Sequence, residues 1–193
     1  MKRIFSIATT ILLGTTGLSA QNPDRALIFG LSSGGADHLA DLTTSSPAAS
    51  FTPGFSLGAN AGLQLTRNLA VHADFTFTKN GAWGATPFQG EDVNRFFFGA
   101  QVRYRYPLAI GFTPYGFAGL GTVSIDQLGQ DTFRPTTKPA LMYGGGGSYT
   151  IPRSRFEAFV EVKGFSYRWD MAGFDRTMID VTFGAGVSYR WGF

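Results

Sequence analysis

The sequence predicts an all-β protein, an eight-stranded antiparallel up-and-down transmembrane β-barrel. Three observations favour this fold: long segments alternate apolar with polar residues, the connections between them alternate in length, and the polar faces are rich in glycine. The alternation is clearest in the segment 181–193, whose apolar face consists of Val181, Phe183, Ala185, Val187, Tyr189, Trp191 and Phe193. One face of such a strand suits lipid, and the other suits a narrow polar interior.

Residues 1–20 are predicted to be a cleaved secretory signal peptide, which leaves residues 21–193 as one outer-membrane β-barrel domain. The positive start Lys2-Arg3 precedes a short apolar core, and the small-residue stretch 17–20 precedes the expected cleavage point. The alternative is an N-terminal membrane anchor. Threonine and glycine interrupt the apolar run, however, and a helical span needs about 20 apolar residues.

The predicted mature chain is nearly neutral. Loss of Lys2 and Arg3 reduces the 16 basic residues to 14, against 13 acidic ones. This balance gives no electrostatic support to nucleic-acid binding, so no nucleic-acid partner is expected. The sequence has no cysteine, which excludes disulfides and thiolate metal sites.

Eight segments are predicted to form strands, at 26–33, 51–66, 69–78, 94–106, 112–125, 139–151, 156–169 and 178–193. Segment 26–33 is apolar on both faces, and Leu27, Phe29 and Leu31 are its favoured outward set. Segment 112–125 mixes glycine with large apolar residues, so its faces are not assigned. An even number of strands allows a closed antiparallel barrel with both termini at one end.

In the other predicted strands, regular alternation shows which residues share a face. Segments 51–66 and 69–78 alternate on either side of a two-residue turn, and 94–106 repeats the pattern. Segment 139–151 carries four consecutive glycines within the alternation, and 156–169 begins with single charges opposite alanine and valine. Each strand therefore offers one lipid-like face and one small or polar face.

The connections alternate between short and long, and this order predicts the topology. Short turns are expected at 67–68, 107–111 and 152–155, and long polar loops at 34–50, 79–93, 126–138 and 170–177. Outer-membrane barrels have short turns in the periplasm and long loops outside the cell. Both termini are therefore predicted to be periplasmic, and the loops to be extracellular.

Periodicity does not say which face of the sheet is inside. A soluble lipocalin-like binder of small molecules, with an apolar interior, shares the alternation. Glycines on the polar faces favour the membrane barrel, because they leave room in a bore only just wide enough for side chains: Gly58, Gly62, Gly99, Gly144, Gly146, Gly184 and Gly186.

Aromatic residues are predicted to form two belts at the headgroup levels of the membrane. The belt at the short-turn end would contain Tyr104, Tyr106, Phe112, Tyr149, Phe156, Tyr189, Trp191 and Phe193. The belt at the loop end would contain Phe51, Phe55, Phe77, Trp83, Phe96 and Trp169.

With these features, residues 21–193 resemble the small OmpA/OmpX-type outer-membrane β-barrel family, most suggestively in the stretches 143–149 and 160–162. The resemblance implies an outer membrane of Gram-negative type, with lipid around the barrel. It also implies a role in envelope structure, adhesion or defence, with a possible host or cell-surface ligand. Because nothing follows Phe193, we expect no peptidoglycan-binding domain of the kind that longer members carry.

The same resemblance implies insertion by the barrel-assembly machinery, which reads a C-terminal strand that ends in an aromatic residue. The residues that match this signal are Tyr189, Trp191 and Phe193.

Polar residues on the inward faces are predicted to form one network of salt bridges and hydrogen bonds: His72, Asp74, Gln101, Arg103, Arg105, Glu157, Glu161, Lys163 and Arg190. Pairing is expected because an unpaired charge in a narrow, poorly hydrated tube is costly. The sequence thus predicts a plugged polar lumen without steady conductance and without a cofactor.

A lipid-modifying outer-membrane enzyme of the acyl-transfer type is the main alternative, and it would need a serine positioned beside a histidine. The only histidines are His38 and His72. No serine is expected beside His72 on the bore side, and His38 falls in the predicted loop 34–50. We therefore predict no catalytic residue, and the scattered acidic residues and histidines lack the spacing of a metal site.

Exposed aromatic side chains in the predicted loops are the candidates for contact with a partner, because binding surfaces favour them. They are Trp83, Phe88, Phe133 and Phe174. The alternative for each is a place in the loop-end aromatic belt.

Overall fold

A computed structural model of the chain describes residues 25–39, 50–83, 92–127, 136–170 and 175–192. The predicted signal peptide lies outside these ranges. No helix in the described part of the chain is long and apolar enough to cross a bilayer.

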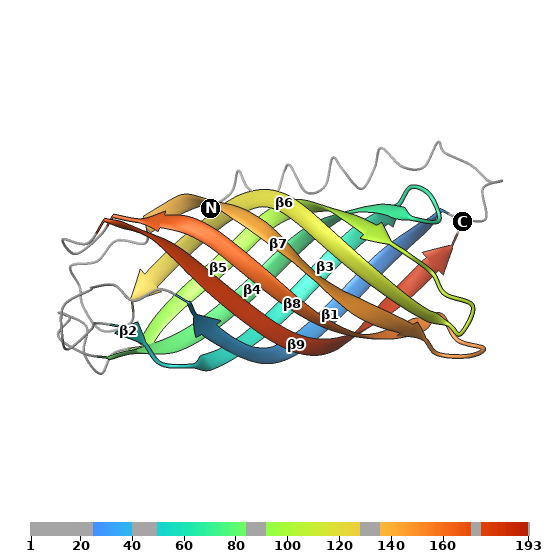
Figure 1. The fold of residues 1–193 in the computed structure, drawn as a ribbon, viewed down its shortest axis with the longest axis horizontal. Helices are drawn as coiled ribbons and strands as arrows, with labels where there is room; N and C mark the ends of the chain where they lie inside the picture. Colours follow the sequence, from blue (N-terminus) through green and yellow to red (C-terminus); the bar gives the residue numbers. More distant parts are fainter. Residues whose placement is uncertain (1–24, 40–49, 84–91, 128–135, 171–174, 193) are drawn as a thin grey trace, which may run out of the picture.

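The described residues form a closed antiparallel barrel of eight long strands plus one short strand segment (Figure 1). The strands are β1 (Ala26–His38), β2 (Ser50–Phe51), β3 (Gly54–Gln64), β4 (Leu69–Trp83), β5 (Asp92–Arg105), β6 (Phe112–Gln127), β7 (Thr136–Thr150), β8 (Phe156–Trp169) and β9 (Arg176–Gly192). Neighbours in the barrel are neighbours in sequence, and β1 closes the barrel against β9. The predicted all-β, eight-stranded transmembrane architecture is confirmed.

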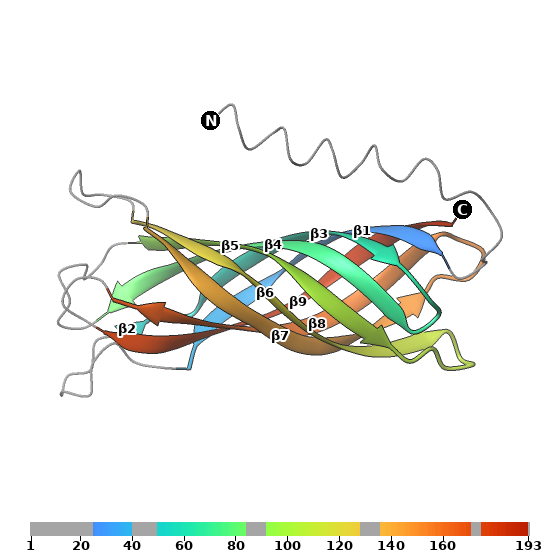
Figure 2. The same cartoon turned by 90° about the horizontal axis from the view of Figure 1, so that it is seen from above.

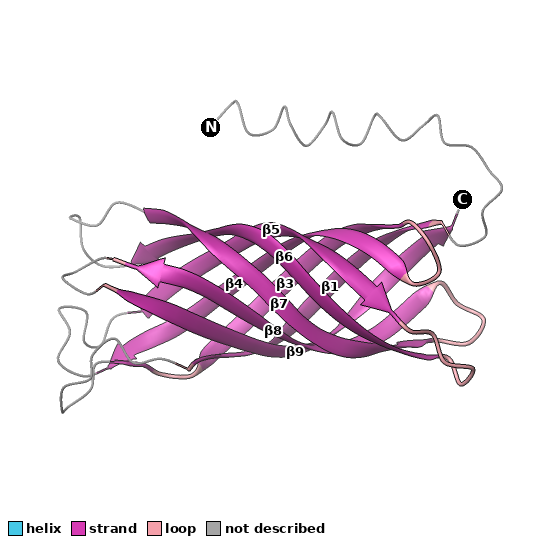
Figure 3. Cartoon of the chain, turned by 45° about the horizontal axis from the view of Figure 1, so that its top comes forward, coloured by secondary structure: helices cyan, strands magenta, loops and turns pink. Residues whose placement is uncertain are grey.

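The strands are strongly tilted around the barrel axis, and both ends of the described chain lie at the same end of the barrel (Figures 2 and 3). This end, here called the short-turn end, carries the connections 65–68, 106–111 and 151–155. The opposite end is the loop end. Several strands continue further toward the loop end than the alternation predicted, so that β1 reaches His38 instead of residue 33 and β4 reaches Trp83 instead of residue 78.

The predicted single strand 51–66 is interrupted at Thr52 and Pro53. Phe51 pairs with Ala82, and Phe55 pairs with Lys79. The stretch between Phe51 and Phe55 is therefore one residue longer than the stretch of β4 that it faces. An extra residue of this kind is a β-bulge, and a proline lacks the N–H that the ladder would use. The bulge reverses the faces, so Phe51 points into the bore while Phe55 points outward.

The outer surface of the barrel is mainly apolar, and buried charges line the interior. Phe98 is 61% exposed, Leu120 68% and Val187 50%, although all three are large apolar side chains. Such a surface suits hydrocarbon and not water, so the lipocalin-like alternative is wrong. In β1, Phe29 and Leu31 point outward as favoured.

Strand β6, whose faces the sequence left open, has a mixed interior face. Leu120 and Phe112 are exposed, whereas Tyr115, Phe117 and Val123 are buried in the bore. Its large inward residues therefore help to fill the barrel.

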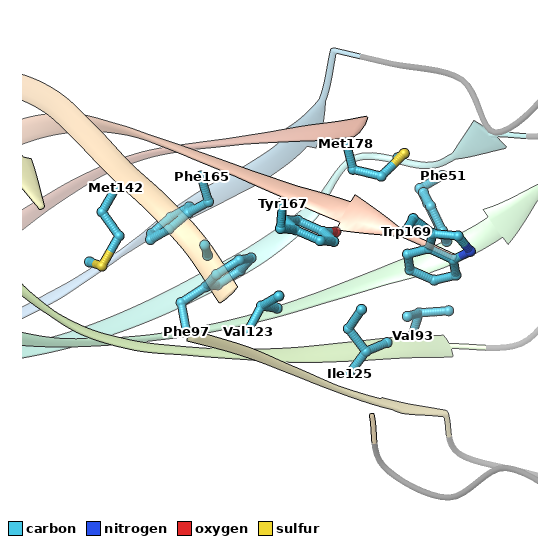
Figure 4. Close-up of a cluster of buried hydrophobic side chains, with 11 residues drawn as sticks. Phe51, Val93, Phe97, Val123, Ile125, Met142, Phe165, Tyr167, Trp169 and Met178 are labelled. Atoms are coloured by element: carbon cyan, nitrogen blue, oxygen red, sulfur yellow. The ribbon is translucent and has the colours of Figure 1, made fainter. Parts of the chain in front are cut away.

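The bore has two chemically different halves, whereas the sequence predicted a plugged polar lumen. The half at the loop end, here called the aromatic half, contains Phe51, Val93, Phe97, Val123, Ile125, Ala140, Met142, Phe165, Tyr167, Trp169 and Met178 (Figure 4). Phe97 stacks on Phe165 with ring centroids 4.0 Å apart. Apolar side chains thus pack against one another across the tube instead of leaving an aqueous path.

Two residues assigned to the loop-end belt belong to this aromatic half instead. Phe51 is 5% exposed and Trp169 2%. The bulge turns Phe51 inward, and Trp169 lies on the face of β8 that also carries Phe165 and Tyr167. Phe55 and Phe96, by contrast, are exposed on the outer surface.

Glycine makes room for large inward side chains. A Cβ added to Gly62 would lie 2.5 Å from Nδ1 of His72, so this imidazole occupies the space that the missing side chain leaves. The expected use of small residues inside the bore is seen here directly.

The packing predicts that Phe97→Ala destabilises the barrel by about 3–5 kcal/mol, because the ring is fully buried and stacked. The neighbouring Phe98→Ala, which faces lipid, should cost much less. Urea unfolding of the two variants in lipid vesicles measures the difference. Equal losses would contradict an interior packed across the bore.

Candidate functional site in the bore

The half of the bore at the short-turn end, here called the polar half, contains eight of the nine polar residues predicted to line it: His72, Asp74, Gln101, Arg103, Arg105, Glu157, Glu161 and Lys163. Their side chains come from β4, β5 and β8, and all are buried. The ninth, Arg190 on β9, is half-buried at the mouth. On each strand every second side chain points into the bore, and this alternation is enough to bring these polar groups together along the barrel axis.

Lys163 links a carboxylate across the bore to one on its own strand. Its Nζ lies 2.8 Å from Oδ2 of Asp74 and 3.1 Å from Oε1 of Glu161. Nη2 of Arg103 lies 3.1 Å from the other oxygen of Glu161. Two cations and two anions therefore balance one another in the middle of the barrel, where water is scarce.

A second group of ion pairs lies nearer the short-turn mouth. Nη2 of Arg105 donates to Oε2 of Glu157 at 2.8 Å, and its Nη1 donates to Gln64. Nη1 of Arg190 lies 3.5 Å from Oε1 of Glu157. The carboxylate of Glu157 is thus shared between an inner and an outer guanidinium.

The predicted members differ in how well they are satisfied. Nε2 of Gln101 donates to Oδ2 of Asp74 at 3.4 Å, whereas neither ring nitrogen of His72 has a hydrogen-bond partner in the protein. His72 lines a cavity of about 10 Å³ together with Arg103 and Tyr115. A space of this size holds about one water molecule, which is the usual partner of such a buried group.

Tyr115 on β6 joins the polar half although the sequence did not indicate it. Its hydroxyl donates to Oε2 of Glu161 at 3.1 Å, and the guanidinium of Arg103 lies 4.3 Å from its ring centroid. Because the faces of β6 could not be assigned from alternation, no sequence signal placed this phenol in the bore.

A separate polar cluster lies inside the loop end, and here it is called the loop-end cluster: His38, Asn80, Arg95, Tyr167 and Asp180. Nδ1 of His38 lies 2.5 Å from Oδ1 of Asp180, and the Tyr167 hydroxyl donates to Oδ2 of the same carboxylate at 3.0 Å. His38 was expected in a loop. It is instead the last residue of β1, which pairs with Asp180 of β9.

Arg95 connects the loop-end cluster to the aromatic half. Its Nε lies 3.5 Å from Oδ2 of Asp180, and its guanidinium carbon lies 4.2 Å from the Phe51 ring centroid and 5.7 Å from that of Trp169. Arg95 lies on the same face of β5 as Arg103 and Arg105, so the sequence could have identified it as an inward residue. Asp180 likewise shares the inward face of Thr182.

The loop-end cluster is not arranged for nucleophilic catalysis. A general base needs one imidazole nitrogen on its orienting carboxylate and the other on a serine or similar nucleophile. Nε2 of His38 instead lies 3.3 Å from Nη1 of Arg95. Within the described ranges, moreover, no group of three or more acidic residues or histidines could hold a metal ion.

The predicted loop and assembly residues are only partly described. Trp83 is the last residue of β4, opposite Ser50, and the side chain of Trp191 is 55% exposed on the outer surface of β9. Tyr189 packs its ring edge-on against Phe156 in the same belt. The remaining candidates, Phe88, Phe133, Phe174 and Phe193, lie outside the described residues.

The model of one protein family, the outer membrane protein beta-barrel domain, matches residues 10–192. No curated protein matches the sequence. Among solved structures, neisserial surface protein A, NspA, has a TM-score of 0.60 at 21% identity, over 86% of this chain and 96% of that one. OprG from Pseudomonas aeruginosa has a TM-score of 0.58 at 14% identity, over 90% and 99% of the two chains. The N-terminal β-barrel domain of OprF from the same organism has a TM-score of 0.52 at 17% identity, over 89% and 100%.

The ion-pair geometry predicts that Lys163→Met destabilises the barrel by about 3–5 kcal/mol, because it leaves Asp74 buried without its cation. The matched control is Arg168→Gln on the same strand, where the ion pair with Asp175 is exposed and stability should hardly change. Denaturant unfolding in vesicles compares the two. A Lys163→Met barrel as stable as the parent would refute the pairing.

Proposed function

The chain belongs to the outer-membrane protein beta-barrel domain family, and on that premise we propose that it acts at the cell surface with a closed bore. It is a transmembrane barrel of the outer membrane of a Gram-negative bacterium. Its proposed role is in envelope structure or surface interaction, such as adhesion or defence, through the extracellular connections.

The single observation that carries this proposal is that both halves of the bore are filled. In the polar half, Lys163 and Arg103 hold their carboxylates at about 3 Å. In the aromatic half, Phe97 and Phe165 stack across the tube. An ion would have to separate buried ion pairs and then cross an apolar section, and each step is unfavourable. Steady conductance is therefore not the proposed activity.

The proposed orientation has both termini and the short turns in the periplasm. The proposed export route begins with removal of residues 1–20 as a signal peptide, followed by insertion of residues 21–193 by the barrel-assembly machinery. Outward-facing aromatic residues at the end of β9, including Trp191, suit the role of an assembly signal. Outer-membrane lipid then surrounds the apolar exterior.

We propose that the protein is not an enzyme and uses no cofactor. His38, the histidine at the loop end of the bore, directs its second ring nitrogen at a guanidinium and not at a hydroxyl. Its short contact with Asp180 is better explained as a structural link that closes β1 against β9 near the loop end.

Planar-bilayer recordings of the purified protein should show no stable current steps. Heat-modifiable migration on gels, checked on the same preparation, establishes that the barrel is folded. An absence of current can then not be attributed to misfolded protein. Stable channels of one defined size would overturn the closed bore.

If the loops bind a surface, the combined variant Phe88→Ala, Phe133→Ala and Phe174→Ala should weaken the attachment of cells that produce the protein to epithelial monolayers. The expected loss is roughly tenfold or more, because aromatic residues contribute much of the binding energy at interfaces. The matched control is Gln89→Ala with Thr132→Ala, next to two of the same positions. Equal attachment by all strains, at equal surface levels, would exclude these aromatic residues as contacts.

A further inference from the structure

The short-turn end of the barrel is strongly basic among the described residues. Its rim carries Arg25, Arg67, Arg153, Arg155 and Arg190. Among the described residues of this end, the one acidic residue is Glu157, which is buried. Glu157 pairs with Arg105 inside the bore and with Arg190 of the rim. The rim therefore has a clear excess of positive charge, although the whole chain is close to neutral.

The arginines form an arc and are not spread evenly around the rim. Arg153 and Arg155 lie in the turn from β7 to β8, Arg190 on β9, Arg25 just before β1, and Arg67 in the turn from β3 to β4. In the barrel these elements are consecutive neighbours, β7–β8–β9–β1–β3–β4. The turn from β5 to β6, on the other side, has no charged residue. Closure of β1 against β9 is what joins the two parts of the arc.

An open pocket lies within this arc, where β7, β8 and β9 meet. It has a volume of about 280 Å³ and is lined by Thr150, Ser154, Arg155, Glu157, Arg190 and Gly192. The backbone N–H of Arg190 donates to the carbonyl of Arg155 at 2.8 Å, which holds the two arginines on adjacent walls. The guanidinium groups of Arg155 and Arg190 suit a phosphate group. The Glu157 carboxylate in the same lining is already paired with Arg105 and Arg190.

The pocket adjoins the aromatic belt of the membrane interface. Nη1 of Arg155 donates to the hydroxyl of Tyr189, whose ring packs on Phe156 in the belt. Trp191, next to Arg190 in sequence, is exposed on the outer surface. Aromatic belts lie at the level of the lipid headgroups, so the arginine arc lies at the level of the lipid phosphates.

We propose that this arc and its pocket bind the phosphate groups of anionic phospholipids in the membrane leaflet at the short-turn end. Clustered arginines beside a membrane attract anionic headgroups, and each contributes about 1 kcal/mol, or roughly fivefold in association. The partner is a lipid and not a soluble anion, because Arg155 on the pocket wall contacts Tyr189 of the belt that anchors the barrel in the interface.

Trp191 provides a local reporter of the lipids beside the pocket. In a Trp83→Phe background the other tryptophan, Trp169, is buried in the bore and out of reach of acyl chains. The barrel is reconstituted in phosphatidylcholine vesicles that contain a fixed fraction of dibrominated phosphatidylglycerol or dibrominated phosphatidylcholine. Quenching of Trp191 fluorescence should be several-fold more effective with the brominated phosphatidylglycerol, and 1 M salt should reduce this preference.

The test variant is Arg153→Gln with Arg155→Gln, in which the preference for phosphatidylglycerol should fall several-fold, because two of the five arginines of the arc are lost. The matched control is Arg168→Gln at the loop end, which should retain the preference of the parent. Heat-modifiable migration verifies that each variant is folded. Equal quenching by the two brominated lipids in the parent, or an unchanged preference in the double variant, would overturn the proposal.

A last arm separates the lipid from free phosphate. Millimolar inorganic phosphate, at constant ionic strength, should leave the lipid preference unchanged. If inorganic phosphate abolished the preference, the pocket would be assigned to a soluble anion and the lipid proposal would be wrong.

Discussion

The narrowness of the bore is the constraint on which the rest of the structure depends. An eight-stranded barrel has an interior just wide enough for side chains, so water cannot compensate an isolated charge there. Inward charges therefore meet opposite charges, as Lys163 meets Asp74 across the bore and Glu161 on its own strand. Glycine serves the same constraint, because the imidazole of His72 fits only where Gly62 lacks a side chain.

The two halves of the bore meet this constraint in different ways. The polar half uses ion pairs that cross from β8 to β4 and β5, whereas the aromatic half uses apolar side chains that need no partner. Near the loop end, Arg95 combines both kinds of contact, since it approaches a carboxylate and two aromatic rings. Filling the tube in both halves leaves the ends of the barrel as the surfaces that can interact. The loop end and the basic short-turn rim offer different chemistry there.

The polar half could be anticipated from the sequence because parity alone sets the direction of each side chain. Strands β4 and β5, and the first half of β8, alternate regularly, so the sequence alone places Asp74, Arg103 and Glu161 in the bore. Tyr115 could not, because glycine and large apolar residues occur on both faces of β6. Phe51 was misplaced because a bulge at Pro53, invisible to a period of two, reverses the faces.

The sequence by itself determined the strand class, the number of long strands, the alternation of turns and loops, and the identity of most inward charges. These follow from local periodicity, which each strand carries independently. Only the tertiary structure decided which inward residues meet across the bore, that its loop end is aromatic, and that His38 pairs with Asp180. Such contacts depend on strand register and on closure of β1 against β9, which relate residues more than a hundred positions apart. No local pattern contains that information.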